Sequence, residues 1–419
     1  MLTKCQNLKK LSFISLERDA DFDESVTAQQ RFLPSQLTLE HLHSLTIDNV
    51  GGEAYTFILG LRAPLRFLSL EIDLDFEGNP GLDFPDGIDL RDPVPVLVHF
   101  SSTLEEIVVI WADWQVDWQT CVQNKIRCHS ITTHHSSIPD IASFMYMFPN
   151  LKKLEIFDDY FHDIEERRNF NIQSQSQFAN TNNGLWNQLS WEDLTLDADP
   201  QSLYGLAISK GIHALYVGHC QPEQVALVKL AIQSCIPNIL NLELPASNHV
   251  GILKTCLARM TGMFQYHQLR SLSLRLPFSS SQIAEDTDRT IENGIQEIID
   301  QLVEVLRTTS TSLKYLHISL KPAELFTISG DGSSTRQYLG TKQVALMENI
   351  LEVVPSVEYL STDLGVRFYG VYYFPKSWKM VVSVSEGGTE TRSREILDEK
   401  EFEALFKEHM GMSLMDLQF

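Results

Sequence analysis

The chain has 419 residues, 43% of them hydrophobic, so it can bury a large core but exceeds the size at which one compact core usually stops growing. Its 33 basic and 55 acidic residues give a formal net charge of −22, which repels nucleic acid phosphates and anionic lipid. We therefore expect several domains or a repeat architecture, and neither nucleic acid nor a membrane as a partner.

The cysteines and the N-terminus indicate an intracellular protein. The six cysteines are too few and too scattered for the disulfide framework of a small secreted domain; they are Cys5, Cys121, Cys128, Cys220, Cys235 and Cys256. The opening stretch MLTKCQNLKKLSF has no apolar run of signal-peptide length, and no later segment is apolar over the length needed to span a bilayer. We expect a soluble protein of the cytoplasm or the nucleus.

A short leucine motif recurs along the chain. FPNLKKLEIFDD at 148–159 nearly repeats CQNLKKLSFISL at 5–16, and both contain the pattern apolar-x-x-apolar-x-apolar. The pattern starts at Leu8, Leu42, Leu65, Leu104, Leu151, Trp191, Ile212, Ile239, Leu269, Leu313 and Val357, with weaker CHSITT at Cys128 as a further candidate. Alternate side chains of a strand point to opposite faces, so each motif predicts a short strand with its leucines inward. The irregular spacing of a constant motif is typical of a solenoid with variable outer loops.

Helices ended by proline separate several of the predicted strands. QPEQVALVKLAIQSCIPN, 221–238, places Val225, Val228, Ile232 and Cys235 on one helical stripe and ends at Pro237. KQVALMENILEVVPS and PDIASFMYMFPN follow the same plan, and a longer helix has Ile295, Ile298, Ile299, Leu302, Val305 and Leu306 on one face. Proline cannot continue a helix and favours an extended residue before it. The repeating unit is therefore strand, loop, helix, proline, strand.

These residues resemble a known repeat family. IHALYVGHC at 212–220 matches the leucine-rich repeat pattern with cysteine at its ninth position, where other repeats have Asp73, Asp159, Asp199 and Ser247. The chain is similar to irregular leucine-rich repeat proteins of the ribonuclease-inhibitor-like kind, especially the repeat region of fungal F-box/leucine-rich repeat proteins. The resemblance implies an α/β horseshoe solenoid, with a parallel β-sheet on the concave face and helices on the convex face. Val50, Ala112 and Pro277 depart from the small polar ninth residue.

An F-box would precede the repeats as a short helical segment opening with Leu-Pro. FLPSQLTLEHL at 32–42 has this pair, but Gln36 stands where an acidic residue is usual, and the alternation of Leu37 and Leu39 favours an extended chain. The segment also follows the first leucine motif. Three explanations stay open: the box was lost, the chain is a fragment, or this relative never had one.

The rest of the chain divides into loops and an end cap. We expect exposed loops at 73–95, 161–184 and 278–290, which are polar or rich in glycine and proline. The solenoid is predicted over 1–365. Residues 366–419 are predicted to form a capping β-hairpin and helix, with strands at 366–374 and 378–385 and with Phe402, Leu405 and Phe406 inward.

One segment suggests catalysis. WADWQVDW at 111–118 sets Asp113 and Asp117 among three tryptophans, which resembles a sugar platform with an acid/base pair. The spacing of Trp111, Trp114 and Trp118 is also one face of a helix, so core packing is the simpler interpretation. No G-x-S-x-G, H-E-x-x-H or complete dinucleotide motif occurs.

Three further motifs resemble ligand sites without completing one. DLDFEG, starting at Asp73, copies the opening of a calcium loop but has Phe84 where a bidentate glutamate is required. Cys121, Cys128, His129, His134 and His135 are zinc ligand types, but their spacing matches no C-x2-C pair. SGDGSST at 329–335 lacks the strand, lysine and helix of a phosphate loop. We therefore predict no catalytic residue, no metal and no cofactor.

What remains is a recognition surface. Strand positions on the predicted concave face collect Phe67, Glu71, Phe157, Asp197, Tyr216, Arg275, Tyr315, His317 and Tyr359. Aromatic residues and arginine are common anchors of protein interfaces. We expect a non-enzymatic module that binds a protein partner, and the resemblance implies a ubiquitination target with a ligase adaptor as a second partner. The alternatives are a glycan hydrolase acting through 111–118 and a purely structural scaffold.

Overall fold

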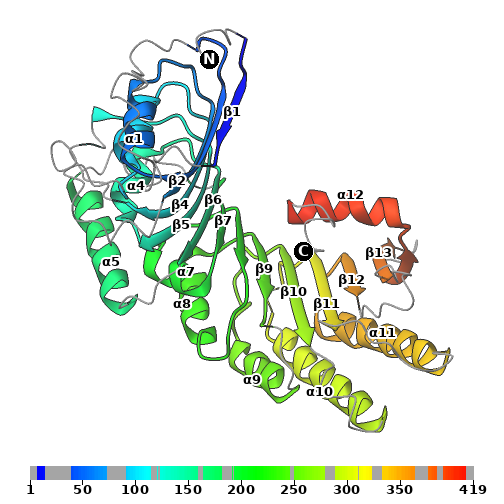
Figure 1. The fold of residues 1–419 in the computed structure, drawn as a ribbon. Helices are drawn as coiled ribbons and strands as arrows, with labels where there is room; N and C mark the ends of the chain where they lie inside the picture. The colour runs from blue at the N-terminus through cyan, green and yellow to red at the C-terminus, as the bar shows by residue number, and fades with distance from the viewer. Residues whose placement is uncertain are drawn as a thin grey trace. The chain divides into compact units, whose positions relative to one another are not determined.

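The protein consists of two compact units built from alternating strands and helices (Figure 1). The computed structural model describes residues 7–14, 39–72, 91–114, 120, 123–158, 164–181, 191, 193–245, 250–278, 288–309, 311–322, 333–363, 376–384 and 390–411. Unit 1 comprises residues 1–196 and 205–208, and unit 2 comprises residues 197–204 and 209–419. The strand β7 (Thr195–Ala198) and the helix α7 (Pro200–Leu206) lie where the chain passes from one unit to the other.

In the described residues of unit 1, six parallel strands follow one another in sequence order. They are β1 (Lys10–Phe13), β2 (Ser44–Val50), β3 (Phe67–Ile72), β4 (Glu106–Asp113), β5 (Ser130–Ser137) and β6 (Lys153–Asp158). Its helices are α1 (Gly52–Gly60), α2 (Val94–His99), α4 (Ile141–Met147) and α5 (Ile164–Thr181).

Unit 2 repeats this plan and ends with an antiparallel pair. Its parallel strands are β8 (Ala214–Val217), β9 (Ile239–Glu243), β10 (Ser271–Phe278), β11 (Tyr315–Pro322) and β12 (Tyr359–Asp363). The antiparallel strands β13 (Lys376–Val384) and β14 (Glu390–Ile396) follow. The helices are α8 (Val225–Cys235), α9 (Val250–Met260), α10 (Asp288–Arg307), α11 (Ser333–Val353) and α12 (Glu399–Met410).

The strand register explains the leucine motif. Leu45, Leu68, Ile107, Ile131 and Leu154 are aligned across unit 1, and Leu215, Leu240, Leu272, Leu316 and Leu360 are aligned across unit 2. All ten side chains are buried. Each motif therefore supplies one residue to a continuous apolar row, which a single repeat could not bury alone. The predicted α/β strand and helix alternation is confirmed, including the weak candidate at Cys128, which leads into β5.

One motif is displaced in register. The pattern at Ile239 predicted that Ile239 points inward, but Ile239 pairs with Ser271 and Leu240 pairs with the buried Leu272. The motif of this strand therefore begins at Pro237, which the pattern did not count as apolar. Ile239 consequently lies on the opposite face of the sheet.

Two of the predicted loop and cap assignments differ from the structure. Residues 164–181 form the helix α5 and not a loop. Buried amides hold this polar helix, because Asn171 Oδ1 accepts from Ile141 N at 2.9 Å and Asn171 Nδ2 donates to Gly205 O at 2.8 Å. The hairpin strands are β13 and β14, and the predicted strand at 366–374 lies outside the described residues.

Other predicted segments are only partly described. Residues 73–90, 279–287 and the F-box candidate up to residue 38 lie outside the described residues. Across the part of the chain that the structure describes, helices long and apolar enough to span a bilayer are not found.

Candidate partner-binding surface

The sheet of each unit has a face opposite its buried leucine row, which we call the open face. Strand alternation places the predicted residues there: Phe67, Glu71 and Phe157 in unit 1, and Tyr216, Arg275, Tyr315, His317 and Tyr359 in unit 2. Asp197 lies in β7 and is half-buried. Three of the nine residues therefore belong to unit 1 and six to unit 2.

The open face of unit 2 is covered by the helix α12. Figure 1 shows α12 across the strands from α9, α10 and α11, and α12 contacts β9 and β10. Its side chains Phe402, Phe406 and Met410 pack with Ala214, Ile239 and Tyr315 in one buried cluster. Tyr216, Tyr359 and Leu397 pack against the edge of this cluster.

Several aromatic rings meet in this interface. The ring of Phe406 lies edge-on to Tyr315 at 6.1 Å and to His317 at 5.3 Å between centroids. His409 stacks on Tyr315 at 5.4 Å and lies 5.3 Å from Tyr359. Such pairs add to the free energy gained from burying their area. Tyr315 is 1% exposed and His317 is 3% exposed as a result.

The sequence of α12 favours an independent helix. Asp398 Oδ1 accepts from Glu401 N at 2.9 Å and Glu401 Oε2 accepts from Asp398 N at 3.3 Å, which completes a capping box. Gly411 ends the helix with φ of +69°, a conformation that glycine adopts without strain. Phe402, Phe406 and Met410 are spaced four residues apart and therefore form one stripe.

The open face of unit 1 has accessible aromatic and charged side chains. The ring of Phe157 lies 5.3 Å from His134, and both are half-buried. Beside them, Lys153 Nζ lies 2.6 Å from Glu155 Oε1, and Thr132 Oγ1 donates to the same carboxylate. This surface offers apolar area together with both signs of charge, which is the usual composition of a transient interface.

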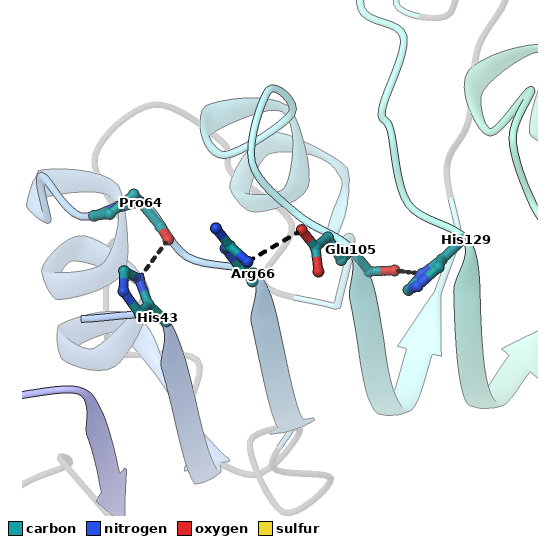
Figure 2. Close-up of polar contacts among 5 residues, drawn as sticks. All are labelled: His43, Pro64, Arg66, Glu105 and His129. Atoms are coloured by element: carbon teal, nitrogen blue, oxygen red, sulfur yellow. Dashed lines mark hydrogen bonds and ion pairs between the residues drawn. The ribbon is translucent and has the colours of Figure 1, made fainter. Parts of the chain in front are cut away.

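A polar row lies where the strands of unit 1 begin (Figure 2). His43 Nδ1 is 3.4 Å from Pro64 O, Arg66 Nη1 is 3.7 Å from Glu105 Oε1, and His129 Nδ1 contacts Glu105 O. Arg66 and Glu105 are 64% and 54% exposed, so their ion pair adds little stability. The row was not predicted from the sequence, although four of its members directly precede a strand, namely His43, Arg66, Glu105 and His129.

Of the tryptophan cluster at 111–118, Trp114 is part of the core, and Trp111 and Asp113 are half-buried. Trp111 and Asp113 belong to β4 and not to a helix, and Trp114 is 4% exposed. Trp114 Nε1 donates to Thr133 Oγ1 at 3.0 Å, and its ring lies edge-on to Phe144 at 5.2 Å. A buried indole with a satisfied N–H cannot serve as a sugar platform. Asp117 and Trp118 lie outside the described residues.

The thiols have structural surroundings. Cys128 Sγ donates to Ser130 O at 3.0 Å, and burial raises the pKa of Cys128 to about 12. Within the described ranges, no group of three or more His, Cys, Asp or Glu side chains could hold a metal ion. Cys121, the acidic loop at 73–84 and residues 329–332 lie outside those ranges.

The residues that sequence reasoning missed are those of α12 that cover the open face. Phe402 and Phe406 were expected to point inward, but their target was not identified, and the role of Met410 was not recognised. The signal was the apolar stripe itself, because a capped amphipathic helix needs an apolar surface to pack on. In comparisons with known proteins, no family model and no curated protein matches this chain.

Proposed function

We propose that the protein is a non-catalytic recognition module that binds a protein partner through the open face of its parallel sheet. The observation that supports this is α12, because it demonstrates that aromatic residues of this face can hold a helix. In unit 1 the equivalent face has the half-buried aromatic residues Phe67 and Phe157. The proposal includes a horseshoe solenoid with the open face as its concave side, as the leucine-rich repeat resemblance implies.

The resemblance to F-box/leucine-rich repeat proteins adds a finer proposal. The bound partner would be a target for ubiquitination, and a second surface or subunit would link the module to a ligase. The net charge of −22 favours a partner with a basic region through long-range attraction. No observation on the described residues favours the glycan hydrolase.

The test is affinity purification from the source cell with two full-length variants. F67A/F157A removes two aromatic side chains from the open face of unit 1, and F170A removes a 47% exposed phenylalanine from α5 as a matched control. We expect wild type and F170A to recover the same protein partner and F67A/F157A to lose at least 90% of it. Truncating interface aromatics typically costs ~2 kcal/mol or more of binding free energy, which is about a 30-fold change in Kd.

The ligase link is read from the same samples. If it holds, a cullin adaptor is recovered with all three proteins, because F67A/F157A changes only the target-binding face. Recovery of no stable partner by wild type, or equal recovery by F67A/F157A, would contradict the proposed open-face function.

A further inference from the structure

The sheet face on which α12 packs includes many polar side chains for a buried surface. Across unit 2 the strand register aligns Tyr216, Asn241, Ser273, His317, Ser361 and Ser377 in one row. Five of these side chains, all except the half-buried Tyr216, are buried. The parallel row on the opposite face is leucine throughout β8 to β12. A surface built for permanent burial is expected to match that leucine row, and this one does not.

Some polar atoms of this face have hydrogen-bond partners in the docked state, and others have none. His317 Nδ1 is 3.2 Å from Ser361 Oγ, and Ser377 Oγ donates to Ser361 Oγ at 3.2 Å. Among the described residues, Ser273 Oγ and the hydroxyl of Tyr315 are buried without a hydrogen-bond partner. Burial also raises the pKa of Tyr315 well above its usual value. A buried hydroxyl without a partner loses its hydrogen bonds to water, so these atoms oppose the docking of α12.

The contacts that favour docking are ones that a separate helix could make. Three side chains of one stripe enter the cluster, and Tyr216 Oη donates at 2.5 Å to Met410 O in the last turn of α12. The last carbonyls of any helix lack partners within the helix and can accept such a bond. Both ends of α12 are capped by its own residues, Asp398 with Glu401 and Gly411. These caps favour the helical form through contacts within residues 398–411.

We propose that the open face of unit 2 is a binding site for an amphipathic helix of a protein partner, and that α12 is an intramolecular ligand which such a helix displaces. This inference rests on the proposed recognition function and names its partner. The partner helix has aromatic side chains four residues apart, followed after four more by a flexible apolar side chain such as methionine. Aromatic anchors of this spacing are the usual means by which a helix binds an apolar groove.

The test uses a fluorescent synthetic peptide with the sequence of residues 398–411 and the full-length protein. In wild type, α12 occupies the face and reduces the apparent affinity for the peptide by the fraction of molecules in which the face is free. F402A/F406A weakens the intramolecular contact and is expected to bind the peptide at least tenfold more tightly than wild type in fluorescence polarisation. A peptide in which both phenylalanines are alanine is expected not to bind.

A second variant protects the test against misfolding. D398A removes the capping box of α12 and leaves the open face and all three contact side chains unchanged. Loss of such a cap typically lowers the equilibrium constant for helix formation by roughly fivefold. D398A is therefore expected to bind the peptide about fivefold more tightly than wild type. E403A changes an exposed residue of the same helix and is the matched control, with an affinity equal to that of wild type.

The inference is overturned if the peptide binds none of the proteins, or if wild type binds it as tightly as D398A and F402A/F406A while circular dichroism shows all of them folded. Neither result affects the proposed function, which is tested on unit 1 through Phe67 and Phe157. Loss of partner recovery in that experiment with normal peptide binding here would contradict only the proposed function.

Discussion

At the residue scale, the buried cysteines are part of the packing and not of a reactive site. Cys128, Cys220 and Cys235 are free and buried, and burial raises the pKa of each to about 12. A thiol with so high a pKa has very little thiolate at neutral pH, and the thiolate is the nucleophilic form. This agrees with their buried positions, where each thiol acts as a small apolar group.

The raised thiol pKa predicts a loss of stability in alkali. Below pH 9 these cysteines are protonated in both the folded and the unfolded chain. Between pH 9 and about 12 only the unfolded chain ionises, so the free energy of unfolding falls as pH rises, by about 1.4 kcal/mol per pH unit for each such group. Urea unfolding of wild type and C235A from pH 8 to 11 tests this. The free energy of unfolding of C235A is expected to fall less steeply with pH than that of wild type. Equal pH dependence of the two proteins would contradict the buried-thiol explanation.

At the element scale, the leucine motif predicted the parallel strands better than the other elements, such as β14 and α5. The motif identifies nearly every parallel strand because each leucine is needed in a shared apolar row. It fails at β9, where Pro237 takes the first apolar position, and at β14, whose sequence ETRSREI has almost no apolar residue. The helix α5 was missed for a related reason, since buried amides and not an apolar stripe hold it in place. Hydrophobic pattern cannot reveal contacts made by polar groups.

The candidate site was predicted less completely than the fold. Strand alternation correctly placed Tyr216, Tyr315, His317 and Tyr359 on one face, because that depends only on local geometry. The sequence could not indicate that α12 covers them. The contact joins residues far apart in the chain, such as Tyr216 and Met410, and depends on where the hairpin directs the chain.

The helix α5 provides a prediction about buried polar contacts. Replacing Asn171 by alanine leaves the amide of Ile141 and the carbonyl of Gly205 without their partner inside unit 1. Each buried group left unsatisfied costs about 1–3 kcal/mol, so N171A is expected to lower the free energy of unfolding by about 2–4 kcal/mol. Urea unfolding followed by tryptophan fluorescence measures this. The exposed Gln173 on the same helix is the control, and Q173A is expected to stay within about 0.5 kcal/mol of wild type.

At the scale of the whole molecule, the two units share one building plan but differ in what their open faces contact. In unit 1 the predicted residues Phe67, Glu71 and Phe157 are half-buried, whereas in unit 2 Tyr315 and His317 are buried beside the helix α12. The antiparallel strand β13 also ends the leucine row, because Trp378 pairs with Leu360 and is 5% exposed. A repeat protein needs such an end, since its last apolar residues have no further repeat to cover them.

The repeat plan predicts that damage stays local. L316A creates a cavity in β11 and is expected to cost about 2–5 kcal/mol in unit 2, because Leu316 is fully buried. Each repeat contacts mainly its neighbours, so the slow-exchanging amides of β10 to β12 should lose protection while those of β3 and β4 change much less. Hydrogen exchange read by mass spectrometry distinguishes the two units. Equal loss of protection in both would indicate one cooperative unit.

The junction between the hairpin and α12 affects how tightly a partner helix must bind in order to displace α12. Leu397 N donates to Ser377 O at 3.0 Å, and Leu397 packs against the edge of the buried cluster, so the chain is anchored immediately before the helix begins. If α12 leaves the sheet while Leu397 stays in place, α12 remains tethered close to its binding site. Short tethers of this kind give a local concentration on the order of millimolar. A competing helix in solution must therefore bind far more tightly than α12 itself, or first detach Leu397.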